Sequence, residues 1–150
     1  GCETLAVEEL SKLPCLRHLN LSGCARILSD FPMDMELKTV TDLGIDLGDN
    51  EPPPQFLSWL TKKRSLPNLE MLYFPGTKKS IVSILVNSLC DAEGSFREQL
   101  RGIGFYKSEL EEKNLKRIVF ELLPMYSNLY HLLLSANQIG SLRCIVECIE

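Results

Sequence analysis

Apolar residues recur along the chain as short triples with the spacing Leu-x-x-Leu-x-Leu, each followed three positions later by a small or polar residue. The pattern is clearest in residues 16–24 and 129–137, where it ends in Cys24 and Asn137. Looser copies occupy residues 40–48, 69–77 and 100–108. Alternation of apolar and polar positions is typical of β-strands with one buried face. The pattern therefore predicts five short strands.

Apolar stripes with helical spacing lie between and after these segments, at residues 56–60, 81–89, 115–123 and 142–149. Apolar residues at i, i+3, i+4 and i+7 form one face of a helix. The proline run 52–54 is expected to begin the first helix, and Ser108 and Glu111 are expected to form a capping box before the third. Residues 25–39 contain Pro32 and predict a turn or a brief helix.

The five segments begin at residues 16, 40, 69, 100 and 129, at intervals of 24, 29, 31 and 29 residues. One strand and one helix at this period resembles a leucine-rich repeat protein. The resemblance implies an α/β fold: a curved, horseshoe-shaped solenoid of about five repeats, with parallel strands on the concave face and helices on the convex face. The first copy is similar to the cysteine-containing subclass through Cys24, and the last to the ribonuclease-inhibitor subclass through Asn137.

On this interpretation residues 1–150 form one leucine-rich repeat domain. Neither end shows a polar capping segment, and the chain begins with Gly1 rather than Met. We therefore expect a fragment of a longer array, or end-to-end association through the uncapped repeats. Gly48 departs from the pattern because it has no side chain to hydrogen-bond at the position after the strand.

Side chains between the buried strand positions are expected to face the concave surface in three columns. The first column is His18, Asp42, Met71, Gly102 and His131; the second is Asn20, Gly44, Tyr73, Gly104 and Leu133; the third is Ser22, Asp46, Pro75, Tyr106 and Ser135. Tyrosine is a common interface anchor, so Tyr73 and Tyr106 are the leading candidates, beside a bare patch at Gly102 and Gly104. The full set of candidate partner-binding residues is Tyr73, Tyr106, His18, Asn20, Asp42, Asp46, Met71 and His131.

Composition and charge narrow the classes of partner. The chain is 45% hydrophobic and 24% charged, which is typical of a globular protein, and its formal net charge is −4. An acidic balance argues against a nucleic-acid or membrane-surface partner, and no apolar run has the length of a membrane span. The basic clusters at 62–64 and 78–79 are small and are expected to be solvated helix ends.

The six cysteines include no C-x-x-C pair. We expect buried free thiols in a reducing compartment, hence an intracellular and cytoplasmic protein with no metal site. His18 and His131 are four strands apart, about 19 Å, which excludes a shared metal or catalytic pair. His18 can reach Asp42 on the adjacent strand, but Ser22 lies two columns away. A hydrolase that uses this His–Asp pair is the alternative from a different class.

The sequence thus favours a non-enzymatic scaffold for protein–protein interaction, without catalytic residues or cofactors, that binds a protein partner through the concave strand face. The resemblance implies two contexts for such a domain: the substrate receptor of a ubiquitin ligase, or the repeat domain of an innate sensor. A structural spacer between flanking domains is a further alternative.

Overall fold

The structure is a computed structural model that describes residues 8–23, 28–29 and 31–134. Within this part of the chain, five strands form one sheet in which every pair of neighbours is parallel and the spatial order follows the chain. The strands are β1 (His18–Asn20), β2 (Asp42–Gly44), β3 (Met71–Tyr73), β4 (Gly102–Gly104) and β5 (His131–Leu133). Each strand lies inside a segment where the apolar spacing predicts one. The α/β class is therefore confirmed.

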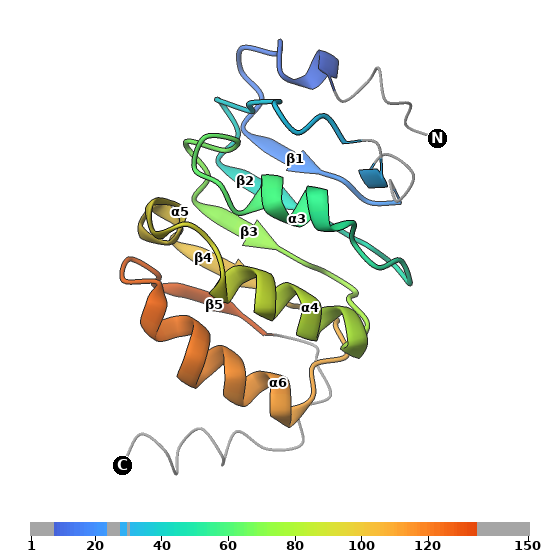
Figure 1. Cartoon of the computed structure of the whole chain (residues 1–150), viewed down its shortest axis with the longest axis vertical. Helices are drawn as coiled ribbons and strands as arrows, with labels where there is room; N and C mark the ends of the chain where they lie inside the picture. Colours follow the sequence, from blue (N-terminus) through green and yellow to red (C-terminus); the bar gives the residue numbers. More distant parts are fainter. Residues whose placement is uncertain (1–7, 24–27, 30, 135–150) are drawn as a thin grey trace.

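In the described part of the chain, helical segments connect β2 to β3, β3 to β4 and β4 to β5. They are α3 (Pro54–Leu60) after β2, α4 (Lys79–Cys90) and α5 (Gly94–Gln99) after β3, and α6 (Glu112–Arg117) after β4, which continues through a π-helical turn η1 (Ile118–Leu122) and a 3₁₀ turn η2 (Leu123–Met125). Helix α4 contacts both α3 and α6. Figure 1 shows α3, α4 and α6 one below another in the same order as the strands. Strands and helices thus form two parallel rows.

The hydrophobic core lies between these two rows. The central strand residues Leu43, Leu72 and Ile103 are fully buried, as are Ile45, Phe74 and Phe105, which come two positions later. Helix α4 contributes the predicted stripe, of which Ile81, Val82, Leu85, Val86 and Leu89 are buried. The residues on either side of each central strand position face away from the helices. One face of the sheet is consequently covered by helices, and the other carries the predicted columns.

The proline run begins the first helix as predicted. Pro53 is the N-cap of α3 and Pro54 its first residue, where the fixed φ of proline suits a helix and no intrahelical N–H is needed. The basic cluster 62–64 follows α3 as an exposed turn and is not part of its last turn. Helix α5 was not predicted, because Phe96 is its only buried residue and one apolar position forms no stripe.

The capping-box prediction for Ser108 and Glu111 is wrong. Glu111 is itself the N-cap of α6, and that cap has no side-chain hydrogen bond. The Ser108 hydroxyl instead accepts the backbone N–H of Thr77 at 3.0 Å and donates to the carbonyl oxygen of Phe74 at 3.0 Å. Both partners are buried backbone groups in the segment between β3 and α4, and leaving such groups unpaired costs more than leaving an exposed helix end uncapped.

We predict that Ser108→Ala lowers the free energy of unfolding by about 1–3 kcal/mol, because it leaves the buried N–H of Thr77 without its acceptor. Urea denaturation followed by circular dichroism measures the change. Ser58→Ala, at an exposed position inside α3, is the matched control and should change stability by less than about 0.5 kcal/mol. Equal effects of the two substitutions would contradict the assigned role of Ser108.

A second set of hydrogen bonds joins successive strand-containing segments at the edge where the strands begin. The residue immediately before each of the last four apolar segments donates from its side chain to a backbone carbonyl that lies 26–33 residues earlier in the chain. The four bonds are Thr39 to Leu13 (3.4 Å), Asn68 to Lys38 (2.6 Å), Gln99 to Leu66 (2.6 Å) and Asn128 to Glu98 (2.6 Å). Each amide or hydroxyl pairs with a backbone carbonyl outside the strands: those of Leu13, Lys38 and Leu66 lie in loops, and that of Glu98 lies near the end of α5.

Two cysteines lie in the described part of the chain. Both are free thiols, as predicted, but Cys15 is exposed and Cys90 is only half-buried. Cys15 directly precedes the first apolar segment, 16–24, as Asn68 directly precedes the segment 69–77. The predicted positions of Cys2, Cys24, Cys144 and Cys148, and the helix expected at 142–149, lie outside the described residues. Of the helices that are described, none has the length and apolarity to cross a membrane.

Candidate functional site

The sheet face opposite the helices carries the candidate residues in the predicted register. His18, Asp42, Met71, Gly102 and His131 are consecutive partners across the five strands, and Asn20, Gly44, Tyr73, Gly104 and Leu133 form the next column. Of the third column, Ser135 lies outside the described residues. The strand alternation therefore identified correctly which residues form the first two columns.

The bare patch expected at Gly102 and Gly104 is not present. Both glycines are buried. A Cβ atom added to Gly102 would lie 2.5 Å from the sulfur of Met71, and one added to Gly104 would lie 2.6 Å from Cδ1 of Tyr73. The side chains of Met71 and Tyr73 thus lean across β4 and occupy the space that the two glycines leave.

The open space on this face lies two strands away from β4, above Gly44 of β2. We call it the tyrosine hollow; its volume is about 240 Å³, and its lining residues are His18, Leu19, Asn20, Asp42, Gly44, Tyr73, Pro75 and Tyr106. A Cβ atom added to Gly44 would have as its three nearest neighbours atoms of Asn20, at 3.7–3.8 Å. Because Tyr73 leans toward β4, the space above Gly44 stays open. Five of the eight candidate residues line this hollow.

Asp42 gives the tyrosine hollow its negative charge. Its Oδ2 atom lies 3.0 Å from Nδ1 of His18 and accepts the Thr41 hydroxyl at 2.7 Å. The His18 side chain is 79% exposed and that of Asp42 only 28%. Partial burial, and then the negative charge of Asp42, raise the pKa of Tyr73 above its ordinary value. The Tyr73 phenol is therefore protonated at neutral pH and can donate a hydrogen bond.

The His18–Asp42 contact anticipated from the sequence is present. The Ser22 hydroxyl donates to Oδ1 of Asn20 at 2.5 Å. In the part of the chain that the structure describes, no Ser, Thr or Cys side chain forms a hydrogen bond with His18. A histidine activates a hydroxyl only within hydrogen-bond reach. As it stands, the pair can contribute hydrogen bonds and charge to recognition.

Three candidate residues lie outside the tyrosine hollow. Met71 covers Gly102, as described above. Asp46 accepts the backbone N–H of Gly48 at 2.9 Å and so stabilises a turn in which Gly48 adopts φ +57°, a conformation that favours glycine. His131 is exposed on β5, at the opposite end of its column from His18. The structure does not bring the two histidines together.

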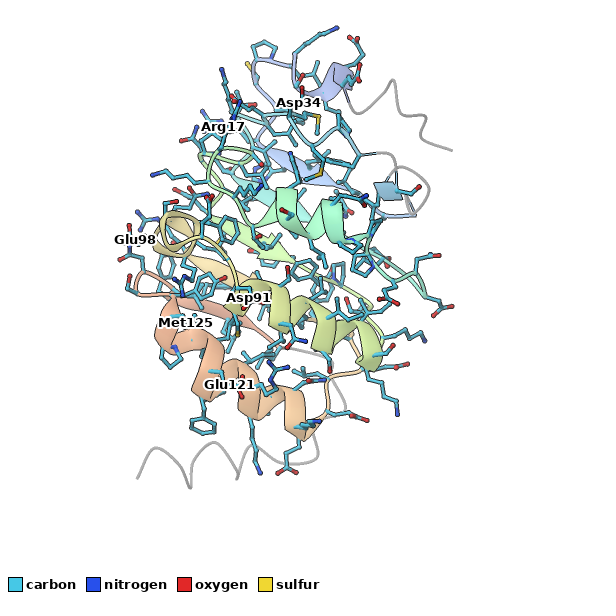
Figure 2. The ribbon with its side chains drawn as sticks, viewed as in Figure 1. Arg17, Asp34, Asp91, Glu98, Glu121 and Met125 are labelled. Atoms are coloured by element: carbon cyan, nitrogen blue, oxygen red, sulfur yellow. The ribbon has the colours of Figure 1, made fainter. Side chains whose placement is uncertain are left out.

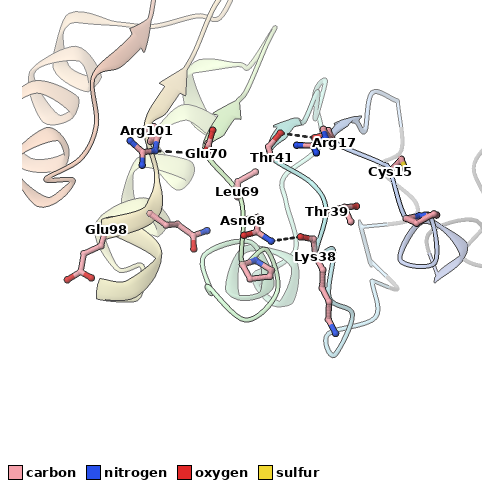
Figure 3. Close-up of a pocket in the computed structure, with 13 residues that line it drawn as sticks. Cys15, Arg17, Lys38, Thr39, Thr41, Asn68, Leu69, Glu70, Glu98 and Arg101 are labelled. Atoms are coloured by element: carbon pink, nitrogen blue, oxygen red, sulfur yellow. Dashed lines mark hydrogen bonds and ion pairs between the residues drawn. The ribbon is translucent and has the colours of Figure 1, made fainter.

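A larger cavity of about 530 Å³ lies at the edge where the strands begin. Figure 3 shows its polar side chains, among them Asn68 bonded to the Lys38 carbonyl, and Arg101 beside Glu70 with 3.8 Å between Nε and Oε1. In Figure 2, Arg17 and Glu98 lie along this same edge. Several of these polar groups contact neighbouring units, so we assign the cavity a structural role.

Sequence reasoning missed the donors at this edge, although a signal for two of them exists. The tripeptides Pro67-Asn68-Leu69 and Ser127-Asn128-Leu129 both place an asparagine directly before an apolar segment. Asparagine can hydrogen-bond nearby backbone groups from a turn, which gives the recurrence a physical meaning. At the equivalent positions, Thr39 donates from a hydroxyl and Gln99 from a longer amide. A search for asparagine alone therefore does not find all four donors.

Residues 8–23, 28–29 and 31–134 contain no group of three or more His, Cys, Asp or Glu side chains that could hold a metal ion. Comparison of the chain with protein-family models, with curated proteins and with solved structures finds no match.

Proposed function

We propose that this protein is a non-enzymatic scaffold, built as a leucine-rich repeat solenoid, that binds a protein partner through the sheet face opposite its helices. The repeat interpretation is supported by the five strands that follow the predicted spacing in chain order. It is further supported by equivalent hydrogen bonds between successive units, such as Asn68 to Lys38 and Asn128 to Glu98. A stack of such units exposes one strand face as a continuous surface.

The observation that carries the binding proposal is the tyrosine hollow. Tyr73 and Tyr106 are both half-buried, so each presents part of its ring at the surface while the rest is held by packing. Rigid aromatic side chains at the edge of a concavity are the residues that most often dominate interface energy. Because the fold itself is compatible with many roles, the proposal depends on this site and not on the architecture.

We predict that the double substitution Tyr73→Ala/Tyr106→Ala weakens partner binding at least tenfold, because loss of one interface anchor typically costs about 2 kcal/mol or more. Wild-type and variant proteins, immobilised at equal density, are compared for the proteins they recover from a cell extract, with quantitative mass spectrometry as the readout. The matched control is Phe120→Ala, which removes an aromatic ring that is 42% exposed on η1.

Proteins recovered by the wild type and by Phe120→Ala, but not by the double variant, are the expected result. Equal recovery by all three would contradict the proposal and would favour the structural-spacer alternative, in which no surface of the sheet has a partner. Circular dichroism spectra of the three proteins should coincide, because neither tyrosine belongs to the core between the sheet and the helices.

A further inference from the structure

We infer that the tyrosine hollow receives an arginine side chain of the partner. This inference rests on the proposed function, because it names the chemistry that the same surface recognises. Three properties of the hollow carry it: a carboxylate with a free oxygen, aromatic walls, and a volume that suits one side chain.

The carboxylate of Asp42 can form a further hydrogen bond. Its two contacts, with His18 and Thr41, both use Oδ2, and Oδ1 has no hydrogen bond or ion pair with any residue in the described part of the chain. Within that same part, no Lys or Arg lines the hollow to neutralise the charge. A half-buried carboxylate with one unused oxygen favours a cationic donor over an anionic or neutral group.

The walls select among cations. Tyr73, Tyr106 and Pro75 line the hollow beside Asp42. A guanidinium is planar and weakly hydrated, so it can lie against an aromatic ring while its N–H groups point at a carboxylate; an ammonium is a strongly hydrated point charge and fits such a site less well. Arginine is therefore the preferred occupant, ahead of lysine.

The volume sets the size of the ligand. About 240 Å³ is below the roughly 300–1,000 Å³ of typical small-molecule pockets, so the hollow has space for one side chain and not for a whole cofactor. Its base is Gly44, and the nearest atoms to an added Cβ there are at ordinary contact distances. A Cβ atom at position 44 therefore fits at ordinary contact distances, and we expect a longer side chain there to extend into the hollow.

The test is a nuclear magnetic resonance titration of the ¹⁵N-labelled protein with acetylated Gly-Gly-X-Gly-Gly amides, in which X is arginine, citrulline, lysine or glutamate. Citrulline has the shape of arginine without its charge. We expect the arginine peptide to shift the amide resonances of Gly44 and Tyr73 in a saturable manner. Its dissociation constant should be at least fivefold lower than those of the citrulline and lysine peptides, and the glutamate peptide should cause no shift.

Two variants check the location of binding. Asp42→Asn and Gly44→Leu should each weaken arginine binding at least fivefold, whereas Asp91→Asn, which removes the same charge at the exposed end of α4, should leave it unchanged. The dispersion of the amide spectrum shows in each case that the variant is folded. Failure of the arginine peptide to shift these resonances would overturn the inference.

Other outcomes separate this inference from the proposed function. Equal binding of arginine and citrulline, or undiminished binding by Asp42→Asn, overturns the choice of arginine. In that case, a partner recovered by the wild type and lost with Tyr73→Ala/Tyr106→Ala would still support binding through this sheet face. If the wild type and the double tyrosine variant recover the same proteins, and the arginine peptide does not bind, both the proposed function and the choice of arginine are overturned.

Discussion

Leu72→Asp is expected to abolish folding of this protein at 25 °C. Leu72 is the central residue of the central strand β3 and is fully buried between the sheet and the helices. Removing its side chain alone costs about 2–5 kcal/mol, and an unpaired carboxylate in the same place adds several more. The sum approaches the whole stability of a typical domain, about 5–15 kcal/mol. Circular dichroism and amide spectra of the variant should be those of an unfolded chain.

Met71→Asp is the matched control, because it introduces the same carboxylate one residue earlier. Met71 is half-buried on the open face, where a carboxylate can remain hydrated. We expect the free energy of unfolding to fall by less than about 2 kcal/mol, mainly through loss of the contact between Met71 and Gly102. Similar damage from both substitutions would mean that the strand faces are assigned wrongly.

The sequence was sufficient to predict strand positions and register, because one physical property determined both. Side chains on a strand alternate between faces, so burying Leu43, Leu72 and Ile103 places their neighbours on the opposite face in aligned columns. Helix α4 was predictable for the same reason, from its stripe of five buried apolar residues. Helix α5 and the role of Ser108 were not, since each depends on which neighbouring unit the segment meets.

The content of the site could be predicted better than its shape. Tyr73, Asp42 and His18 were expected on one surface, and the His18–Asp42 contact follows from their pairing on adjacent strands. The open space was predicted at β4, two strands further along the sheet than the hollow above Gly44. It depends on the direction in which Met71 and Tyr73 lean, and the pattern of apolar and polar positions contains no information about side-chain rotamers.

Trp59, the only tryptophan of the chain, joins α3 to the segment between β1 and β2. It is fully buried, its ring centroid lies 4.4 Å from that of Phe31 and 5.9 Å from that of Phe56, and its Nε1–H donates to the carbonyl of Met35 at 2.8 Å. In the segment 31–40, where the sequence predicted a turn or a brief helix, Phe31 and Met35 are therefore buried and contact α3. Packing of the first two units depends on this cluster.

Trp59→Ala should accordingly lower the free energy of unfolding by about 4 kcal/mol, the sum of a large cavity and an unpaired Met35 carbonyl. Urea denaturation followed by circular dichroism measures it, since the substitution removes the intrinsic fluorophore. Trp59→Phe retains most of the ring contacts but loses the N–H donor, so it should be intermediate. Phe120→Ala, at an exposed aromatic, should cost less than about 1 kcal/mol. An unchanged midpoint for Trp59→Ala would show that the aromatic cluster does not hold the first units together.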